Sequence, residues 1–148
     1  MQIRRATAAD APAIVLQMQR YWEFEAIAGF DPSHAAGMLQ GFLSNPQQGL
    51  CWIADHEGGV DGYLVAVLVF SFEHGGMMAE IDELFVAQTL RSFGIGSSLL
   101  ATAERDLRAA GVVRLQLQLN VKNKRGREFY VRNGFEPREA YDLYEKPL

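Results

Sequence analysis

Hydrophobic and polar positions follow a helical period in the first third of the chain and a strand period after it. Residues Gln2 to Arg5 predict a short first strand. Thr7 with Asp10 three positions later is typical of a capping box, which opens a helix that we expect to reach about Ile27. Glycine and proline then separate this helix from a second one near Ser33 to Leu43.

From residue 49 onward the apolar residues form strand-like runs. Leu50 to Asp55 and Gly62 to Phe72 are separated by a Glu-Gly-Gly loop, and together they predict an antiparallel hairpin. After a second glycine turn, Ala79 to Val86 predicts a third long strand, which leads into a loop over Ala87 to Phe93.

The second half of the chain alternates helices and strands. Gly94 to Ala110 predicts an amphipathic helix that Gly111 stops. Residues 113–120 alternate strictly between apolar and polar side chains, which is the period of a strand with one buried face. Lys124 to Asn133 predicts another helix, and a last strand is expected after it. This order predicts an α/β fold of three layers, in which helices flank a mixed, mostly antiparallel central sheet.

The composition fits one globular domain. The chain has 148 residues, of which 49% are apolar and 22% charged, so we expect a single domain over residues 1–148. The net charge of -4 argues against a nucleic-acid partner. The longest apolar run, Tyr63 to Phe70, is too short to span a bilayer, and Met1 to Thr7 lacks the apolar stretch of a leader. We therefore expect a cytoplasmic protein without a membrane partner.

A loop with two glycines precedes the helix that begins near Gly94. Gly94 and Gly96 let a ligand approach bare backbone, where the first helical N–H groups have no partner within the helix. A pyrophosphate there would gain backbone hydrogen bonds, the favourable end of the helix dipole and a charge-assisted contact with Arg91. The competing interpretation is a tight turn without a ligand. Leu99 replaces the third glycine of a dinucleotide fingerprint, and no Gly-Lys-Ser or Gly-Lys-Thr of a P-loop occurs.

Two motifs resemble those of the GNAT (Gcn5-related N-acetyltransferase) family. The first resembles the acetyl-CoA signature of that family and consists of Val86, then Arg91-x-x-Gly94-x-Gly96, then a Leu-Leu helix. The second resembles a later segment of the family and consists of Asn123-x-x-Gly126-x-x-Phe129-Tyr130 followed by Asn133-Gly134-Phe135. Two positions depart from the family pattern: Ser92 stands where Gly is usual and Gly126 where Ala is usual, which puts the cofactor affinity in question.

The resemblance implies a GNAT-like fold, acetyl-CoA as acyl donor, and acetyl transfer to a primary amine of a small molecule or peptide by direct attack in a ternary complex. It implies that cofactor contacts come from the strand end, the loop, the helix start and the second motif, namely Leu84, Phe85, Val86, Arg91, Ser92, Phe93, Gly94, Ile95, Gly96, Ser97, Asn123 and Tyr130. No metal is expected, because the three histidines lack metal-ligand spacing. A homodimer is left open, since no interface signature is evident.

Catalysis requires a proton acceptor, because an amine is mostly protonated at neutral pH. Three carboxylates, Glu80, Asp82 and Glu83, lie on the strand that ends at Val86, and alternation places Glu80 and Asp82 on one face and Glu83 on the other. By resemblance, an acidic residue on this strand serves as general base, with Glu83 favoured slightly over Glu80. Tyr130 matches the family tyrosine that returns a proton to the departing thiolate. Solvated carboxylates and a core tyrosine are the competing interpretations.

The residues expected to bind the acceptor amine form no motif as specific as those of the donor site. The resemblance places the acceptor pocket in the amino-terminal helical region, where acidic and aromatic groups that suit a cationic amine occur at Trp22, Glu23, Phe24, Glu25 and Asp31. A second interpretation is that the chain has the same fold but catalyses no reaction, and acts as a CoA-binding sensor or interaction module.

Overall fold

A computed structural model describes residues 1–148. They fall into two compact units, residues 1–118 and residues 119–148, and each unit is described by itself. The first unit holds the sheet and three helices, and the second holds one helix. The expectation of a single domain stays a prediction.

Five strands form one sheet in the order of the chain, and the mixed, mostly antiparallel sheet of the prediction is confirmed. The strands are β1 (Gln2–Arg5), β2 (Gly49–His56), β3 (Gly59–Ser71), β4 (Gly76–Val86) and β5 (Arg114–Leu117). The first four pair antiparallel, and β5 runs parallel to β4. The turn between β2 and β3 uses left-handed backbone at Glu57 and Gly58, as tight hairpins require.

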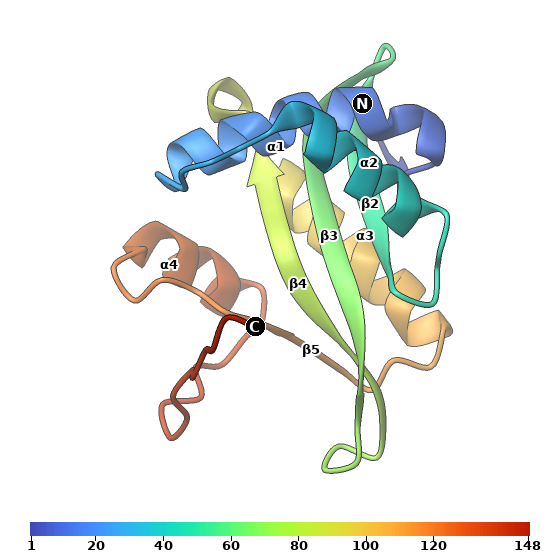
Figure 1. Ribbon diagram of the computed structural model, residues 1–148. Coiled ribbons are helices and arrows are strands. Elements are labelled where there is room, and N and C mark those ends of the chain that lie inside the picture. The colour runs from blue at the N-terminus through green and yellow to red at the C-terminus, as the bar shows by residue number, and fades with distance from the viewer. The chain divides into compact units, whose positions relative to one another are not determined.

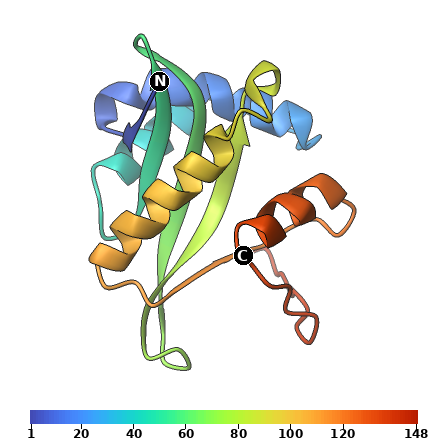
Figure 2. The same cartoon turned by 180° about the vertical axis from the view of Figure 1, so that it is seen from behind.

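Helices cover both faces of the sheet, which confirms the three layers. On one face lie α1 (Ala11–Phe24) and α2 (Pro32–Leu43), in front of the strands in Figure 1. On the other face lies α3 (Ile95–Ala109), in front in Figure 2. Two short 3-10 turns, η1 (Ala8–Asp10) and η2 (Gln88–Leu90), precede α1 and α3. No helix combines the length and the apolar character that crossing a membrane requires.

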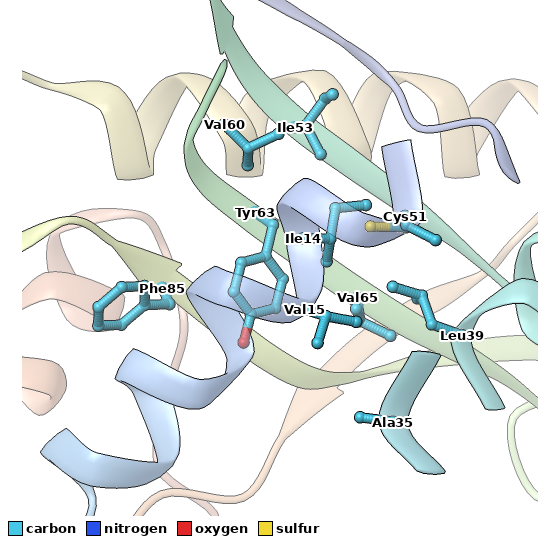
Figure 3. Packing of buried hydrophobic residues seen from close by; sticks show 11 residues of the cluster. Ile14, Val15, Ala35, Leu39, Cys51, Ile53, Val60, Tyr63, Val65 and Phe85 are labelled. Carbon is cyan, nitrogen blue, oxygen red and sulfur yellow. The ribbon is translucent and has the colours of Figure 1, made fainter. Parts of the chain in front are cut away.

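The alternation of β2 and β3 builds one apolar layer on each face. Toward α1 and α2, Cys51 and Tyr63 pack with Ile14 in a cluster of buried side chains (Figure 3). Toward α3, Trp52 is fully buried and its indole N–H donates to an Oδ atom of Asp106 at 2.8 Å. A fully buried large apolar side chain stabilises the fold by about 1.5–3 kcal/mol, so these two layers fix the sheet between the helices.

Three expectations about element bounds are wrong. The first helix ends at Phe24 rather than Ile27, because Ala26 takes a left-handed conformation with φ 55°. The strand expected over residues 113–120 is only β5, because it is the edge strand and pairs with just four residues of β4. The strand expected after the last helix is absent. Residues 136–148 are exposed and include Pro137 and Pro147, which cannot donate to a ladder.

Candidate functional site

A β-bulge in β4 decides which face each strand carboxylate occupies. The ladder pairs Glu83 with Val65 and Glu80 with Val67, and Asp82 is an extra residue between them. Directly opposed residues share a face, and Val65 and Val67 lie two positions apart, so Glu80 and Glu83 both face α1 and α2. The prediction that Glu83 lies on the opposite face from Glu80 is therefore wrong, because strict alternation does not hold across a bulge.

Glu83 is half-buried and accepts two side-chain hydrogen bonds. The Tyr63 hydroxyl donates to Oε2 at 2.7 Å, and the Trp22 indole N–H of α1 donates to Oε1 at 3.2 Å. Burial raises the pKa of Glu83, the hydrogen bonds from Tyr63 and Trp22 lower it, and the charge of Asp82 raises it, with a net rise. A carboxylate with a raised pKa is a better proton acceptor near neutral pH. Two donors leave further lone pairs on the carboxylate for a water or an amine.

Glu80 faces the same helices but is held toward β5. Gln116 donates to Oε2 of Glu80 at 2.7 Å, and Gln118 donates to Oε1 at 2.9 Å. Burial raises the pKa of Asp82, and the charge of Glu80 raises it further. The bulge thus gathers three interacting carboxylates, of which Glu83 is the one in contact with α1.

The end of β4 keeps one edge outside the strand ladder. Pairing with β5 stops at Ile81, whereas pairing with β3 continues to Val86. Val86 pairs with Gly62, where an added Cβ would lie 2.8 Å from the Phe85 carbonyl oxygen, so glycine is required there. The segment from Leu84 to Val86, predicted to contact the cofactor, therefore has a ladder partner on the β3 side alone.

The loop after β4 ends in an open helix start. Ser92 and Gly94 both take left-handed backbone, with φ 75° and 80°. Gly94 is the N-cap of α3 without a side-chain cap, and the first helical bond runs from Ser98 N–H to the Gly94 carbonyl. The preceding N–H groups of the helix, those of Ile95, Gly96 and Ser97, have no acceptor within it. An added Cβ at Gly94 would meet no atom within 4 Å.

Arg91 joins the loop to α1 and β4. Its Nε donates to the Val86 carbonyl oxygen at 3.0 Å, and its guanidinium carbon lies 4.2 Å from the Phe24 ring centroid and 5.3 Å from that of Phe85. Such cation–π contacts hold the guanidinium over the rings. Phe93, another predicted cofactor residue two positions further along the chain, is 77% exposed. A contact of Arg91 with pyrophosphate stays a prediction.

In the second unit, Asn123 and Tyr130 belong to α4 (Lys124–Arg132) and its N-cap. The Asn123 side chain accepts from the Gly126 N–H at 2.8 Å, and an added Cβ at Gly126 would lie 2.8 Å from the Asn123 amide nitrogen. This crowding gives a local reason for Gly at a position where the family usually has Ala. The Tyr130 ring contacts Phe129 and Phe135 edge-on, with centroids 5.1 and 5.4 Å apart. The roles of Asn123 and Tyr130 at the cofactor stay predictions.

The contacts of Tyr63 and Trp22 with Glu83 were not predicted from the sequence. Tyr63 belongs to an apolar run that is typical of a buried core strand. Its hydroxyl could have indicated a polar contact, because a buried tyrosine O–H needs a hydrogen-bond partner. Trp22 was assigned to the acceptor side without a link to β4. No group of three or more His, Cys, Asp and Glu side chains is placed to hold a metal ion.

The family profile described as the acetyltransferase (GNAT) family matches residues 15–135. Aminoalkylphosphonate N-acetyltransferase of Salmonella typhimurium is 36% identical over 96 residues, which are 65% of this chain and 61% of that protein. The aligned part is thus less than two thirds of that relative. The uncharacterized N-acetyltransferase YhfO of Bacillus subtilis is 31% identical over 144 residues, which are 97% of this chain and 95% of that protein.

A solved structure adds the fold. The structure of AAC(6')-Iy in complex with the bisubstrate analog CoA-S-monomethyl-acetylneamine superposes with a TM-score of 0.84 at 17% identity, covering 99% of this chain and 98% of that one. Identity this low shows a shared fold alone. The profile match is what shows the family, since it covers most of the chain and includes the β4 bulge, the loop before α3 and all of α4. The chain belongs to the acetyltransferase (GNAT) family.

Proposed function

We propose that this protein moves an acetyl group from acetyl-CoA to a primary amine of a small molecule or peptide, by direct attack in a ternary complex. Membership of the GNAT family supports acetyl transfer. The observation that carries the proposal is Glu83, a half-buried carboxylate with a raised pKa. It lies three residues before Val86, where β4 leads into the loop and open start of α3.

The donor half of the site fits acetyl-CoA, which supplies the acyl group and a pyrophosphate. The N–H groups at the start of α3, where Gly94 presents no side chain, suit phosphate oxygens. The edge of Leu84 to Val86 that lies outside the ladder suits the pantetheine arm, which would pair there as an extra strand would. The backbone N–H of Val86 would then polarise the thioester carbonyl and stabilise the developing oxyanion.

The proton steps fall to two side chains. For an amine with a pKa of about 10.4, reaching the free base at neutral pH costs about 4 to 5 kcal/mol, and Glu83 would accept that proton directly or through a water. Glu80 is the second candidate base, and its bonds to the glutamines of β5 favour Glu83 over it. Tyr130 would return a proton to the departing thiolate.

The acceptor that fits this site is a cationic amine. The Glu83 carboxylate accepts a hydrogen bond from Trp22, whose ring packs edge-on against Phe30 at 5.3 Å between centroids, and Asp82 adds a second negative charge that acts on Glu83. Negative charge beside aromatic rings favours an ammonium group. The similarity to an aminoalkylphosphonate N-acetyltransferase supports a small-molecule amine as acceptor.

Calorimetric titration with acetyl-CoA, with ATP and NADH as controls for generic phosphate binding, tests the donor half. Thiol release across a panel of amines tests turnover, and Glu83→Gln is compared with Glu73→Gln, a matched change at an exposed position in the turn between β3 and β4. We expect selective binding of acetyl-CoA, acceptor-dependent thiol release, and loss of release in Glu83→Gln alone. Binding without release across the panel would refute the enzyme and favour a CoA-binding module, and absence of acetyl-CoA binding by folded protein would refute the donor site.

A further inference from the structure

Glu83 is the point where three elements of the first unit meet. It lies on β4, its Oε2 accepts from Tyr63 of β3 at 2.7 Å, and its Oε1 accepts from Trp22 of α1 at 3.2 Å. Each carboxylate oxygen therefore has its own donor. Two donors on two oxygens fix the rotation of the carboxylate plane, which a single donor would leave free.

Both donors are held by aromatic packing. The Tyr63 side chain is fully buried, and its ring lies 6.4 Å from that of Phe85 (Figure 3). The Phe85 ring in turn packs edge-on against Tyr21, with centroids 6.2 Å apart. The Trp22 ring packs edge-on against Phe30 at 5.3 Å. The hydroxyl and the indole N–H are thus set in place before any substrate binds, as a preorganised site requires.

We propose that Tyr63 and Trp22 are positioning residues for Glu83, which fix the orientation of its carboxylate and hold it in the ionised form. The inference rests on the proposed function, in which Glu83 is the general base. Nothing else in the reaction requires a tyrosine hydroxyl in the apolar layer under α1, where phenylalanine would pack equally well.

The charges around Glu83 explain why these donors matter. The titratable groups that interact with Glu83 are Tyr21 from α1, Cys51 from β2, Tyr63 from β3 and Asp82 from β4. Three further charged groups act on the neighbours of Glu83: Glu25 on Tyr21, Glu80 on Asp82 and Arg91 on the Phe85 ring. Burial, with the charge of Glu83, raises the pKa of Tyr21 to about 12, and burial raises that of Cys51 to about 12, so both stay neutral near pH 7. Burial and Asp82 raise the pKa of Glu83, and the bonds from Tyr63 and Trp22 are the influences that lower it.

Removing either donor should therefore raise the pKa of Glu83. Tyr63→Phe keeps the ring and loses the hydroxyl, so the pKa of Glu83 rises and its ionised fraction falls at a given acidic pH. The acid limb of kcat/KM should move upward by about one pH unit, which is about a tenfold loss of rate well below the limb and little loss above it. Trp22→Phe should shift the limb in the same direction by less, because its bond is longer.

The experiment measures the pKa of Glu83 directly by NMR and its effect on the rate of acetylation. Carbon-13 NMR titration of glutamate carboxyls, with the Glu83 signal assigned by its loss in Glu83→Gln, gives the pKa in wild type, Tyr63→Phe and Trp22→Phe without any acceptor. The pH profile of acetylation is measured on the same proteins. Tyr144→Phe removes a hydroxyl from a side chain that is 89% exposed and is the matched control. Chemical denaturation verifies that each variant is folded.

We expect the Glu83 pKa and the acid limb to rise together in both variants and to stay unchanged in Tyr144→Phe. An unchanged Glu83 pKa in folded Tyr63→Phe and Trp22→Phe would overturn the inference while leaving Glu83 as base. A raised pKa with an unmoved acid limb would remove Glu83 as the base, and the catalytic role of its two donors with it.

Discussion

Gly94 and Gly111 form a matched pair for testing the loop at the start of α3. They flank the two ends of the helix, both have left-handed backbone with φ 80° and 83°, and an added Cβ at either would meet no atom within 4 Å. A side chain at either position therefore costs backbone strain of about 1–2 kcal/mol and no steric overlap. We expect Gly94→Ala and Gly111→Ala to lower the free energy of unfolding by similar amounts.

Substitution by aspartate adds a negative charge at either position, and only the charge at Gly94 lies where the pyrophosphate is proposed to bind. Gly94→Asp places a carboxylate beside the free N–H groups of the helix start, where the pyrophosphate is proposed to bind. Two unit charges 4 Å apart repel by about 4 kcal/mol at an effective dielectric constant of 20, which weakens binding about a thousandfold. Gly111→Asp adds the same charge at the far end of α3. At about 1.5 Å per residue that is roughly 25 Å away, and salt screens charges beyond about 8 Å.

Calorimetric titration of acetyl-CoA into Gly94→Asp and Gly111→Asp measures the difference in affinity. Urea denaturation compares the stability losses of the two alanine variants and verifies that both aspartate variants are folded. We expect the affinity to fall in Gly94→Asp and to stay at the wild-type value in Gly111→Asp. Wild-type affinity in folded Gly94→Asp, or an equal loss in Gly111→Asp, would refute the placement of the pyrophosphate at this helix start.

Three further predictions concern stability. Asp106→Ala leaves the buried Trp52 indole N–H without its acceptor, so urea denaturation should show a loss of about 2 kcal/mol, and a loss in Asp106→Asn as large would contradict this cause. Ser92→Gly relieves the φ of 75° and Ser92→Ala keeps it, and both lose the hydroxyl, so Ser92→Gly should be more stable than Ser92→Ala by about 1 kcal/mol. The hydrogen bond from the Arg4 guanidinium holds the pKa of Asp10 well below its ordinary 3.8, so its stabilisation is present above that value and is lost as the pH falls toward the folded-state pKa. Denaturation at successively lower pH should therefore show a flatter acid loss in Asp10→Asn than in wild type, and parallel curves would exclude this role.

Element ends were predictable where the signal is local. Gly94 and Gly111 bracket α3, which runs from Ile95 to Ala109, because left-handed backbone next to a helix favours glycine and this preference is visible in the sequence. The same is true of the Glu57-Gly58 turn between β2 and β3. The loop proposed to bind phosphate was therefore located to within a residue.

Register and side-chain contacts were not predictable, because they depend on partners far along the chain. The bulge at Asp82 is set by the pairing of β4 with β3, and without that pairing alternation put Glu83 on the wrong face. Tyr63 meets Glu83 across 20 positions and Trp22 meets it across 61. The alternation over residues 113–120 likewise predicted a longer strand than the four paired residues of β4 allow.

Because of the bulge at Asp82, the number of residues in β4 matters more than which residue occupies the bulge position. Glu80 and Glu83 are an odd number of positions apart, and only the extra residue between them brings both to the same side of the sheet. Deleting Asp82 would reverse one end of the strand and drive a carboxylate into the hydrocarbon layer beneath α3, beside Leu64 and Leu99, whereas replacing Asp82 by another residue keeps both carboxylates where they are. We therefore expect β4 to tolerate substitution at the bulge position far better than the insertion or deletion of a single residue.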